Sequence, residues 1–265
     1  MLIFGFLEFL SPCSDNYCTI LVSGTDCASL YKAGVNQNGV YIIQLDARDN
    51  NTRFDVYCDM VADGGGWTVI QNLINGRFKP FNFCSQRRAE GSDDFYRNWD
   101  SYKNGFGGLN HDFWLGLDKI HLLTKYGNNR MRFDLLDWDK QKAFSEFEYL
   151  RIADEKDKYR ILAGKYNGDA GDPFHTFSYA QTMQSMQFST YGNDNDMDIS
   201  GNCARTFNSG WWFNSCFLVN LNGVWYSSGS YFGKTSNGII WDLWRNHTRG
   251  YSLMKSEIKL RPDLF

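Results

Sequence analysis

Three carboxylates stand at alternate positions in one short stretch of the C-terminal half: Asp194, Asp196 and Asp198. Ca²⁺ prefers about six to eight oxygen ligands, and a looping segment can offer carboxylates and main-chain carbonyls at alternate residues. An EF-hand opening at Asp194 would need Gly at its sixth position and Glu at its twelfth, but the chain has Ile199 and Arg205 there. The pattern therefore indicates a calcium loop of another type or a solvated acidic turn.

Cysteine is the second residue type in this sequence that could do chemistry. The seven cysteines stand at positions 13, 18, 27, 58, 84, 203 and 216. None belongs to a paired spacing with a His cluster, so disulfides explain them better than a structural zinc site. Two Asn-x-Thr sequons, at Asn50 and Asn246, are candidate glycosylation sites and also favour a secreted, extracellular protein.

Catalytic motifs are absent from the sequence. The four His residues are His111, His121, His175 and His247, and none lies in a zinc-protease, nucleophile-elbow or phosphate-loop motif. We therefore expect a binding protein and no enzyme.

Charge and hydropathy exclude further classes. The net charge is −3 and Lys and Arg are scattered, so there is no basic field for nucleic acid. No stretch approaches the roughly eighteen uncharged apolar residues of a membrane-spanning helix. Residues 1–10 are apolar except for Glu8, with no preceding Lys or Arg. We expect residues 1–25 to be a separate N-terminal segment, either a weak secretory signal or an incomplete terminus.

The elements that must position these residues are mostly short strands. Alternating apolar residues predict strands, and one helix-spaced run ending before Gly127 predicts a helix. The expected strands are 39–43, 53–60, 67–71, 130–135, 159–163 and 254–260, and the expected helix is 117–123. Three glycines between the second and third strands predict a hairpin. Residues 167–250 are rich in Gly, Asn, Asp and Ser, so we expect loops held by a disulfide and a metal ion.

Four motifs in fixed order carry a family resemblance. They are NGVY at 38–41; FDVYCD at 54–59 with DGGGWTVIQ at 63–71; DFYRNW at 94–99 with YKNGFG at 102–107 and FWLGL at 113–117; and Cys203, GWWF at 210–213, Cys216 and NLNG at 220–223. Together they resemble the fibrinogen C-terminal domain shared by fibrinogen chains, ficolins, tachylectins and angiopoietins, over residues 26–263. The resemblance implies an α+β fold with a small N-terminal sheet region, a central mainly antiparallel sheet with short helices, and a loop-rich C-terminal ligand-binding region.

The resemblance assigns the cysteines and the calcium ligands. It implies disulfides Cys27–Cys58 and Cys203–Cys216, and leaves positions 13, 18 and 84 open to a bridge between the first two, intermolecular bonds or free thiols. Calcium ligands carried over from the family are the side chains of Asp194 and Asp196 and the carbonyl oxygens of Asp198 and Ser200.

A ligand pocket also follows from the resemblance. Its expected residues are Phe207, Ser215, Cys216, Phe217, Thr235 and Ser236, with a cis peptide between Ser215 and Cys216. Phe207 and Phe217 stand where lectin relatives have Tyr and His, so an apolar wall remains but two polar groups are lost, and we expect a ligand that differs in detail. Trp211 and Trp212 are expected to be structural.

The predicted function is a secreted, calcium-binding recognition protein that binds acetylated or other glycan groups in innate defence. The alternative is an angiopoietin-like ligand for a cell-surface receptor or an extracellular-matrix partner. Weak single-site binding gains from linked copies, so we expect a homo-oligomer or a partner that gathers the domain. Residues 72–86 interrupt a stretch that is continuous in the sequences of the family, and they are predicted to be an insertion.

Overall fold

A computed structural model gives the arrangement of the chain. It describes residues 24–73, 94–125, 129–176, 181–230, 236–244, 251–263 and 265. The expected sites at Thr235 and Asn246, and the cysteines at 13, 18 and 84, lie outside these residues. Within the described part of the chain, no helix is long and apolar enough to cross a membrane.

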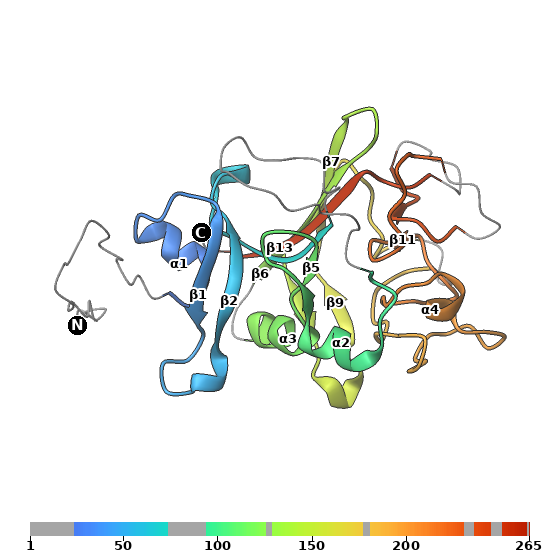
Figure 1. Ribbon diagram of the computed structural model, residues 1–265, viewed down its shortest axis with the longest axis horizontal. Coiled ribbons are helices and arrows are strands. Elements are labelled where there is room, and N and C mark those ends of the chain that lie inside the picture. Colours follow the sequence, from blue (N-terminus) through green and yellow to red (C-terminus); the bar gives the residue numbers. More distant parts are fainter. Residues whose placement is uncertain are drawn as a thin grey trace, which may run out of the picture.

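One large sheet organises the molecule (Figure 1). Its main path in the described residues is β1-β2-β3-β13-β6-β7-β10, with β5 on β3 and β4 on β5. The bounds are β1 Gly39–Gln44, β2 Arg53–Asp59, β3 Trp67–Leu73, β4 Phe106–Gly107, β5 Phe113–Trp114, β6 Asn129–Leu136, β7 Lys142–Phe147, β10 Tyr166–Gly168 and β13 Lys255–Pro262. Every pairing in it is antiparallel. The expected N-terminal and central sheet regions are therefore continuous, because β13 pairs with both β3 and β6.

Alternating side chains explain the central strands. In β6, Met131, Phe133 and Leu135 are buried, while the residues between them are partly exposed. In β13, Ile258 and Leu260 join the hydrophobic core. Lys259 is also fully buried, but it lies among acidic side chains on β2, β6 and β13. The predicted C-terminal strand is confirmed, and its charged residues are less exposed than alternation alone suggests.

The predicted hairpin is formed by β2 and β3, which pair from Tyr57–Val69 to Asp59–Trp67. The turn needs glycine at Gly65, whose φ is +79° and where an added Cβ would lie 2.4 Å from the carbonyl oxygen of Met60.

The insertion predicted at 72–86 starts too early. Asn72 and Leu73 belong to β3, pair with Glu257 and Ser256, and are buried. Their apolar and hydrogen-bonded environment keeps them in the sheet, and residues 74–86 lie outside the described residues. The domain also begins before residue 26, since Gly24 accepts a hydrogen bond from Gln44 N–H at 2.9 Å.

Short helices and two small sheets complete the fold. The helices are α1 Cys27–Lys32, α2 Trp99–Asn104, α3 Leu117–Lys125 and α4 Cys203–Thr206, with 3-10 turns η1 Asn50–Thr52, η2 Ala62–Gly64 and η3 Glu155–Asp157. The small sheets pair β8 Leu150–Ile152 with β9 Ile161–Ala163, and β11 Val219–Asn220 with β12 Ile240–Trp241. The helix predicted at 117–123 is confirmed as α3. The other three are too short for periodicity to reveal.

Aromatic packing supports the loop-rich region. Trp211 and Trp212 are 0% and 3% exposed, which confirms their structural role. Trp212 lies against Phe188 and Trp114, with ring centroids 5.0 and 6.0 Å apart. The indole of Trp212 donates to the carbonyl of Tyr159 at 2.8 Å. Figure 1 shows α4 and β11 at the opposite end of the molecule from α1 and β1.

Candidate calcium loop and ligand pocket

The acidic loop turns on itself through successive carboxylate-to-amide hydrogen bonds. Asp194 Oδ1 accepts from Asp196 N–H at 3.3 Å, and Asp196 Oδ1 accepts from Asp198 N–H at 2.9 Å. Asp198 Oδ1 accepts from both the amide and the hydroxyl of Ser200, at 3.0 and 2.7 Å. The loop thus gathers all four residues expected to bind calcium into one tight turn.

The electrostatics of this turn suit a divalent cation. The pKa of Asp196 is raised to about 6, mainly by burial and also by the neighbouring Asp194 carboxylate, although the amides of Asp198 and Cys203 oppose the rise. Two carboxylates held side by side repel each other when both are ionised. A bound Ca²⁺ would remove that repulsion. The carbonyl of Asp198 is nearly free, since its hydrogen bond from Gly201 is 3.5 Å long. The donor set therefore fits the hard oxygen chemistry of calcium.

The acidic loop also lies against a disulfide. A carboxylate oxygen of Asp198 and the sulfur atoms of Cys203 and Cys216 are all within 4.8 Å of one another. The two sulfurs are bonded to each other, so they are no thiolate ligands for a metal. Both disulfides implied by the resemblance, Cys203–Cys216 and Cys27–Cys58, are present.

Three contacts connect the acidic loop to the two ends of the Cys203–Cys216 disulfide loop. Asp196 Oδ2 accepts from the amide of Cys203 at 2.8 Å, where α4 begins. Met197 N–H donates to the carbonyl of Asn214 at 3.1 Å. The Cys203–Cys216 bond closes the path. The acidic loop is therefore in direct contact with residues 214–216.

The expected pocket residues form an apolar corner. The rings of Phe207 and Phe217 meet edge to face with centroids 4.7 Å apart, and Phe213 lies 5.8 Å from Phe217. The peptide between Ser215 and Cys216 is cis, as the resemblance implied. The carbonyl of Cys216 accepts from Asn214 N–H at 2.7 Å, whereas the Cys216 amide has no acceptor among the described residues. This corner combines an aromatic wall with a backbone donor.

The segment that contains Ser236 is connected to this corner by side chains that the sequence did not predict. Asn237, next to Ser236, donates to Asn208 Oδ1 at 3.2 Å, and Asn208 follows Phe207 in the chain. Tyr226 donates its hydroxyl to Asn237 Oδ1 at 2.7 Å. The structure thus brings the Phe207 and Ser236 segments together. Only the Asn-Gly turn at 237–238 gave a sequence signal for this contact.

The remaining expected site within the described residues is the first sequon. Asn50 is exposed at the start of η1, and the hydroxyl of Thr52 is buried and donates to the carbonyl of Asp49 at 2.7 Å. Asn50 is sterically open to modification, and its use as a glycosylation site stays a prediction.

Comparison with known proteins gives one consistent result. The model of the family "Fibrinogen beta and gamma chains, C-terminal globular domain" matches residues 23–86 and 81–263. Human fibrinogen-like protein 1 is 39% identical over 98% of this chain and 80% of its own length. The human fibrinogen gamma chain is 37% identical over 95% of this chain and 55% of its own.

Solved structures agree. The fibrinogen-like globe domain of human ANGPTL2 superposes with a TM-score of 0.76 at 34% identity, over 90% of this chain and 99% of that domain. Lamprey fibrin D-dimer, complexed with the peptide Gly-His-Arg-Pro-amide, has a TM-score of 0.78 at 33% identity, over 96% of this chain and 78% of that one.

Proposed function

Because the chain belongs to the family of C-terminal globular domains found in fibrinogen beta and gamma chains, we propose that it is a secreted, calcium-dependent recognition domain for acetylated or related glycan groups. The observation that carries the proposal is the direct path from the acidic loop to the aromatic corner, through Cys203, Asn214 and the Cys203–Cys216 bond. Such a path makes ligand binding depend on the state of the loop. Its role is binding, with no catalytic step.

Calcium supplies charge neutralisation in this proposal. Asp194 and Asp196 would hold the ion with their carboxylates, and Asp198 and Ser200 with carbonyl oxygens. The loop residues do the rest: Asp196 keeps its hydrogen bond to the Cys203 amide, and Met197 keeps Asn214 in place. The ion therefore stabilises the native loop and fixes the segment that carries the Cys216 amide.

The aromatic corner selects the ligand. An acetyl methyl group would lie against the rings of Phe207 and Phe217, which are in contact with each other, and the Cys216 amide would donate to the acetyl carbonyl. Each neutral hydrogen bond that a Tyr or His at these positions would add contributes about 0.5 to 1.5 kcal/mol. We therefore expect weaker binding of N-acetyl sugars than in a lectin that has both polar groups.

Calorimetric titration of N-acetylglucosamine tests the proposal. Heat of binding should appear in excess calcium and disappear in excess chelator, and a Phe217→Ala variant should lose it while keeping its calcium-dependent melting temperature. Binding that is equally strong in chelator would contradict the coupling between loop and pocket.

A second function is favoured by the similarity to the angiopoietin-like globe domains: the same surface would then bind a cell-surface receptor or a matrix partner. The peptide complex of lamprey fibrin shows that a related domain binds a peptide. No binding to any member of a glycan array, together with saturable binding to cells, would favour this alternative. Either function gains from homo-oligomers, since linked copies convert weak binding into avidity.

A further inference from the structure

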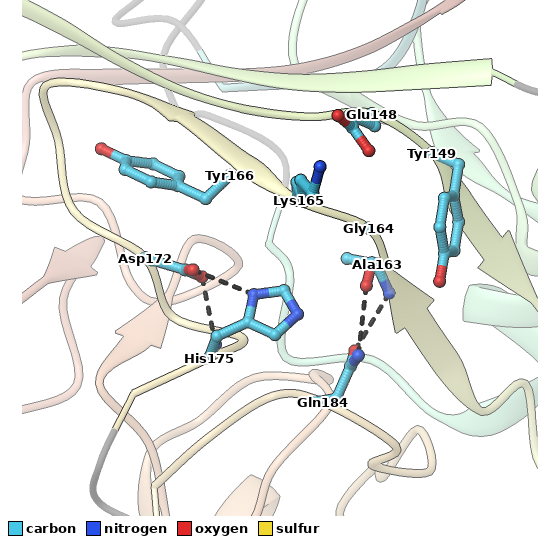
Figure 2. Close-up of a pocket in the computed structure, with 9 residues that line it drawn as sticks. All are labelled: Glu148, Tyr149, Ala163, Gly164, Lys165, Tyr166, Asp172, His175 and Gln184. Carbon is cyan, nitrogen blue, oxygen red and sulfur yellow. Dashed lines mark hydrogen bonds and ion pairs between the residues drawn. The ribbon is translucent and has the colours of Figure 1, made fainter.

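A second concave surface lies at a bend in a β-ribbon. β7 continues into β8 and β9 continues into β10, and the two connections pair with each other: Glu148 N–H donates to the carbonyl of Lys165, and Gly164 N–H donates to the carbonyl of Tyr149, both at 3.0 Å. A cavity of about 530 Å³ opens between this bend and the side chains of Asp172, His175 and Gln184 (Figure 2). That volume is within the range of about 300 to 1,000 Å³ for small-ligand sites. We call this cavity the ribbon groove.

Two oppositely charged side chains line the ribbon groove, and they form no ion pair with each other. Glu148 and Lys165 are exposed, and neither side chain has a hydrogen-bond or ion-pair partner among the described residues. Figure 2 shows both on the β-ribbon side of the cavity. A carboxylate only accepts hydrogen bonds and an ammonium only donates them. A hydroxyl does both, so neighbouring hydroxyls of one ligand suit this pair.

An aromatic ring forms one wall of the ribbon groove. The ring of Tyr149 is packed over Gly164, where an added Cβ would lie 2.6 Å from Tyr149 Cδ1. The absence of a side chain at Gly164 therefore allows the ring to lie against the ribbon. Tyr149 is 39% exposed, so part of a rigid apolar surface faces solvent. Such a surface suits the C–H face of a sugar ring.

The opposite wall is held in place by its own hydrogen bonds. His175 Nδ1 lies 2.9 Å from Asp172 Oδ2, and the other ring nitrogen points away from Asp172 in Figure 2. Gln184 accepts from the amide of Ala163 at 3.0 Å and donates to its carbonyl at 3.1 Å, which ties the loop to the ribbon. The wall is therefore ordered before any ligand arrives, which lowers the entropic cost of binding.

We infer that the ribbon groove is a second carbohydrate-binding site, which takes a neutral sugar residue with its apolar face on Tyr149 and its hydroxyls on Glu148, Lys165 and His175. One free carboxylate and one free ammonium side by side disfavour ligands that carry a single sign of charge. The inference rests on the proposed function only for the class of ligand. The groove contains none of the expected calcium ligands and none of the Phe207 and Phe217 corner.

One segment supports both sites. Thr182, two residues before Gln184, accepts through its carbonyl from the side-chain amide of Asn214 at 3.2 Å. Asn214 also holds Met197 of the acidic loop. The ribbon groove and the aromatic corner thus share the Thr182–Asn214 contact, although their lining residues differ.

The test uses linear trisaccharides of glucose, galactose, mannose and N-acetylglucosamine, titrated into the calcium-loaded protein and followed by amide chemical shifts. At least one neutral trisaccharide should shift the resonances around Tyr149 and Gly164. Tyr149→Ala should weaken that binding about two- to tenfold, and Gly164→Ala should weaken it by displacing the ring. Tyr149→Phe should bind like the native chain, because the ring and not the hydroxyl is the contact.

Two controls separate this site from the first. Phe217→Ala should leave the shifts at the ribbon groove unchanged, whereas it removes binding at the aromatic corner. Leu162→Ala, an exposed change on β9, reports any general effect on the ribbon. The inference is overturned if no neutral trisaccharide shifts the groove, if only sulfated or sialylated sugars do, or if Tyr149→Ala and Leu162→Ala bind alike. Loss of N-acetylglucosamine binding at the corner with retained binding at the groove would count against the proposed function alone.

Discussion

Replacing Lys259 with methionine should destabilise the native protein by about 3 to 5 kcal/mol, because it leaves buried carboxylates without their cation. The Lys259 side chain is fully buried. Its ammonium lies 3.0 Å from Asp59 Oδ2, 2.6 Å from Asp134 Oδ2 and 3.4 Å from Glu257 Oε1. Methionine keeps the apolar stem of the side chain, so the change removes mainly the charge.

The surroundings place the effect at the lower end of that range. The side chains of Asp59 and Glu257 are only 10% and 12% exposed, so water replaces the ammonium poorly. Asp134 is 31% exposed and also contacts Arg132 at 2.8 Å, so it keeps a cation. Asp59 keeps two backbone N–H donors, at 3.1 and 3.0 Å. We therefore expect a loss of about 3 kcal/mol.

The loss should depend on pH in a defined direction. Burial alone would raise the pKa of Asp59, but Lys259 and the two backbone donors outweigh it and lower that pKa. In the native chain, Asp59 thus contributes stability that is present above about pH 4 and is lost as pH falls through its lowered pKa. Without Lys259, the interaction that most strongly offsets the effect of burial is gone. The ionised Asp59 then contributes less to the stability of the native state, or destabilises it. The deficit of the variant should therefore shrink between pH 7 and about pH 4.

Urea unfolding at fixed calcium concentration measures both effects. Lys255→Met is the matched control, since Lys255 lies on the same strand, is 31% exposed and contacts Glu257 at 3.3 Å. Its loss should stay below about 1 kcal/mol. Equal losses in the two variants, or a deficit at Lys259 that does not change with pH, would refute this reasoning.

Three further predictions concern the candidate site. Asp196→Asn should abolish the rise in melting temperature that calcium gives the native chain, measured by thermal melts with and without chelator; a rise of unchanged size would exclude Asp196 as a ligand. Phe207→Tyr and Phe217→His should each tighten N-acetylglucosamine binding about two- to tenfold by calorimetry, because each adds a polar group to the corner, and no gain in either would place the sugar elsewhere. Replacing both Cys203 and Cys216 with Ala should lower the free energy of unfolding by about 3 kcal/mol, given a closed loop of 13 positions, with a loss below about 1 kcal/mol showing that the loops hold without the bond.

Strand alternation predicted the central sheet well. The stretch around Met131 and the C-terminal strand around Ile258 alternate in the sequence, and both became neighbours in the sheet. The order of the strands in the sheet could not be predicted from periodicity, because the β3–β13 pairing joins residues almost 200 positions apart. Such a contact depends on packing of the whole core.

The spacing of the aspartates indicated the acidic loop and the family resemblance implied the two disulfides, but neither predicted the contacts that connect them. Asp194 and Asp196 are visible as a spacing pattern. The hydrogen bonds from Met197 N–H to the carbonyl of Asn214 and from Asn237 to Asn208 involve residues that belong to no recognisable motif. The ribbon groove was missed for the same reason: Glu148 and Lys165 come together only through the pairing of two strand connections.

A crystal structure of the protein with calcium and N-acetylglucosamine tests the central proposal most directly. We expect an ion with calcium anomalous signal between the carboxylates of Asp194 and Asp196, and an acetyl group with its methyl on Phe207 and Phe217 and its carbonyl at the Cys216 amide. An empty acidic loop in excess calcium, or a sugar bound away from this corner while the corner is open to solvent, would contradict it.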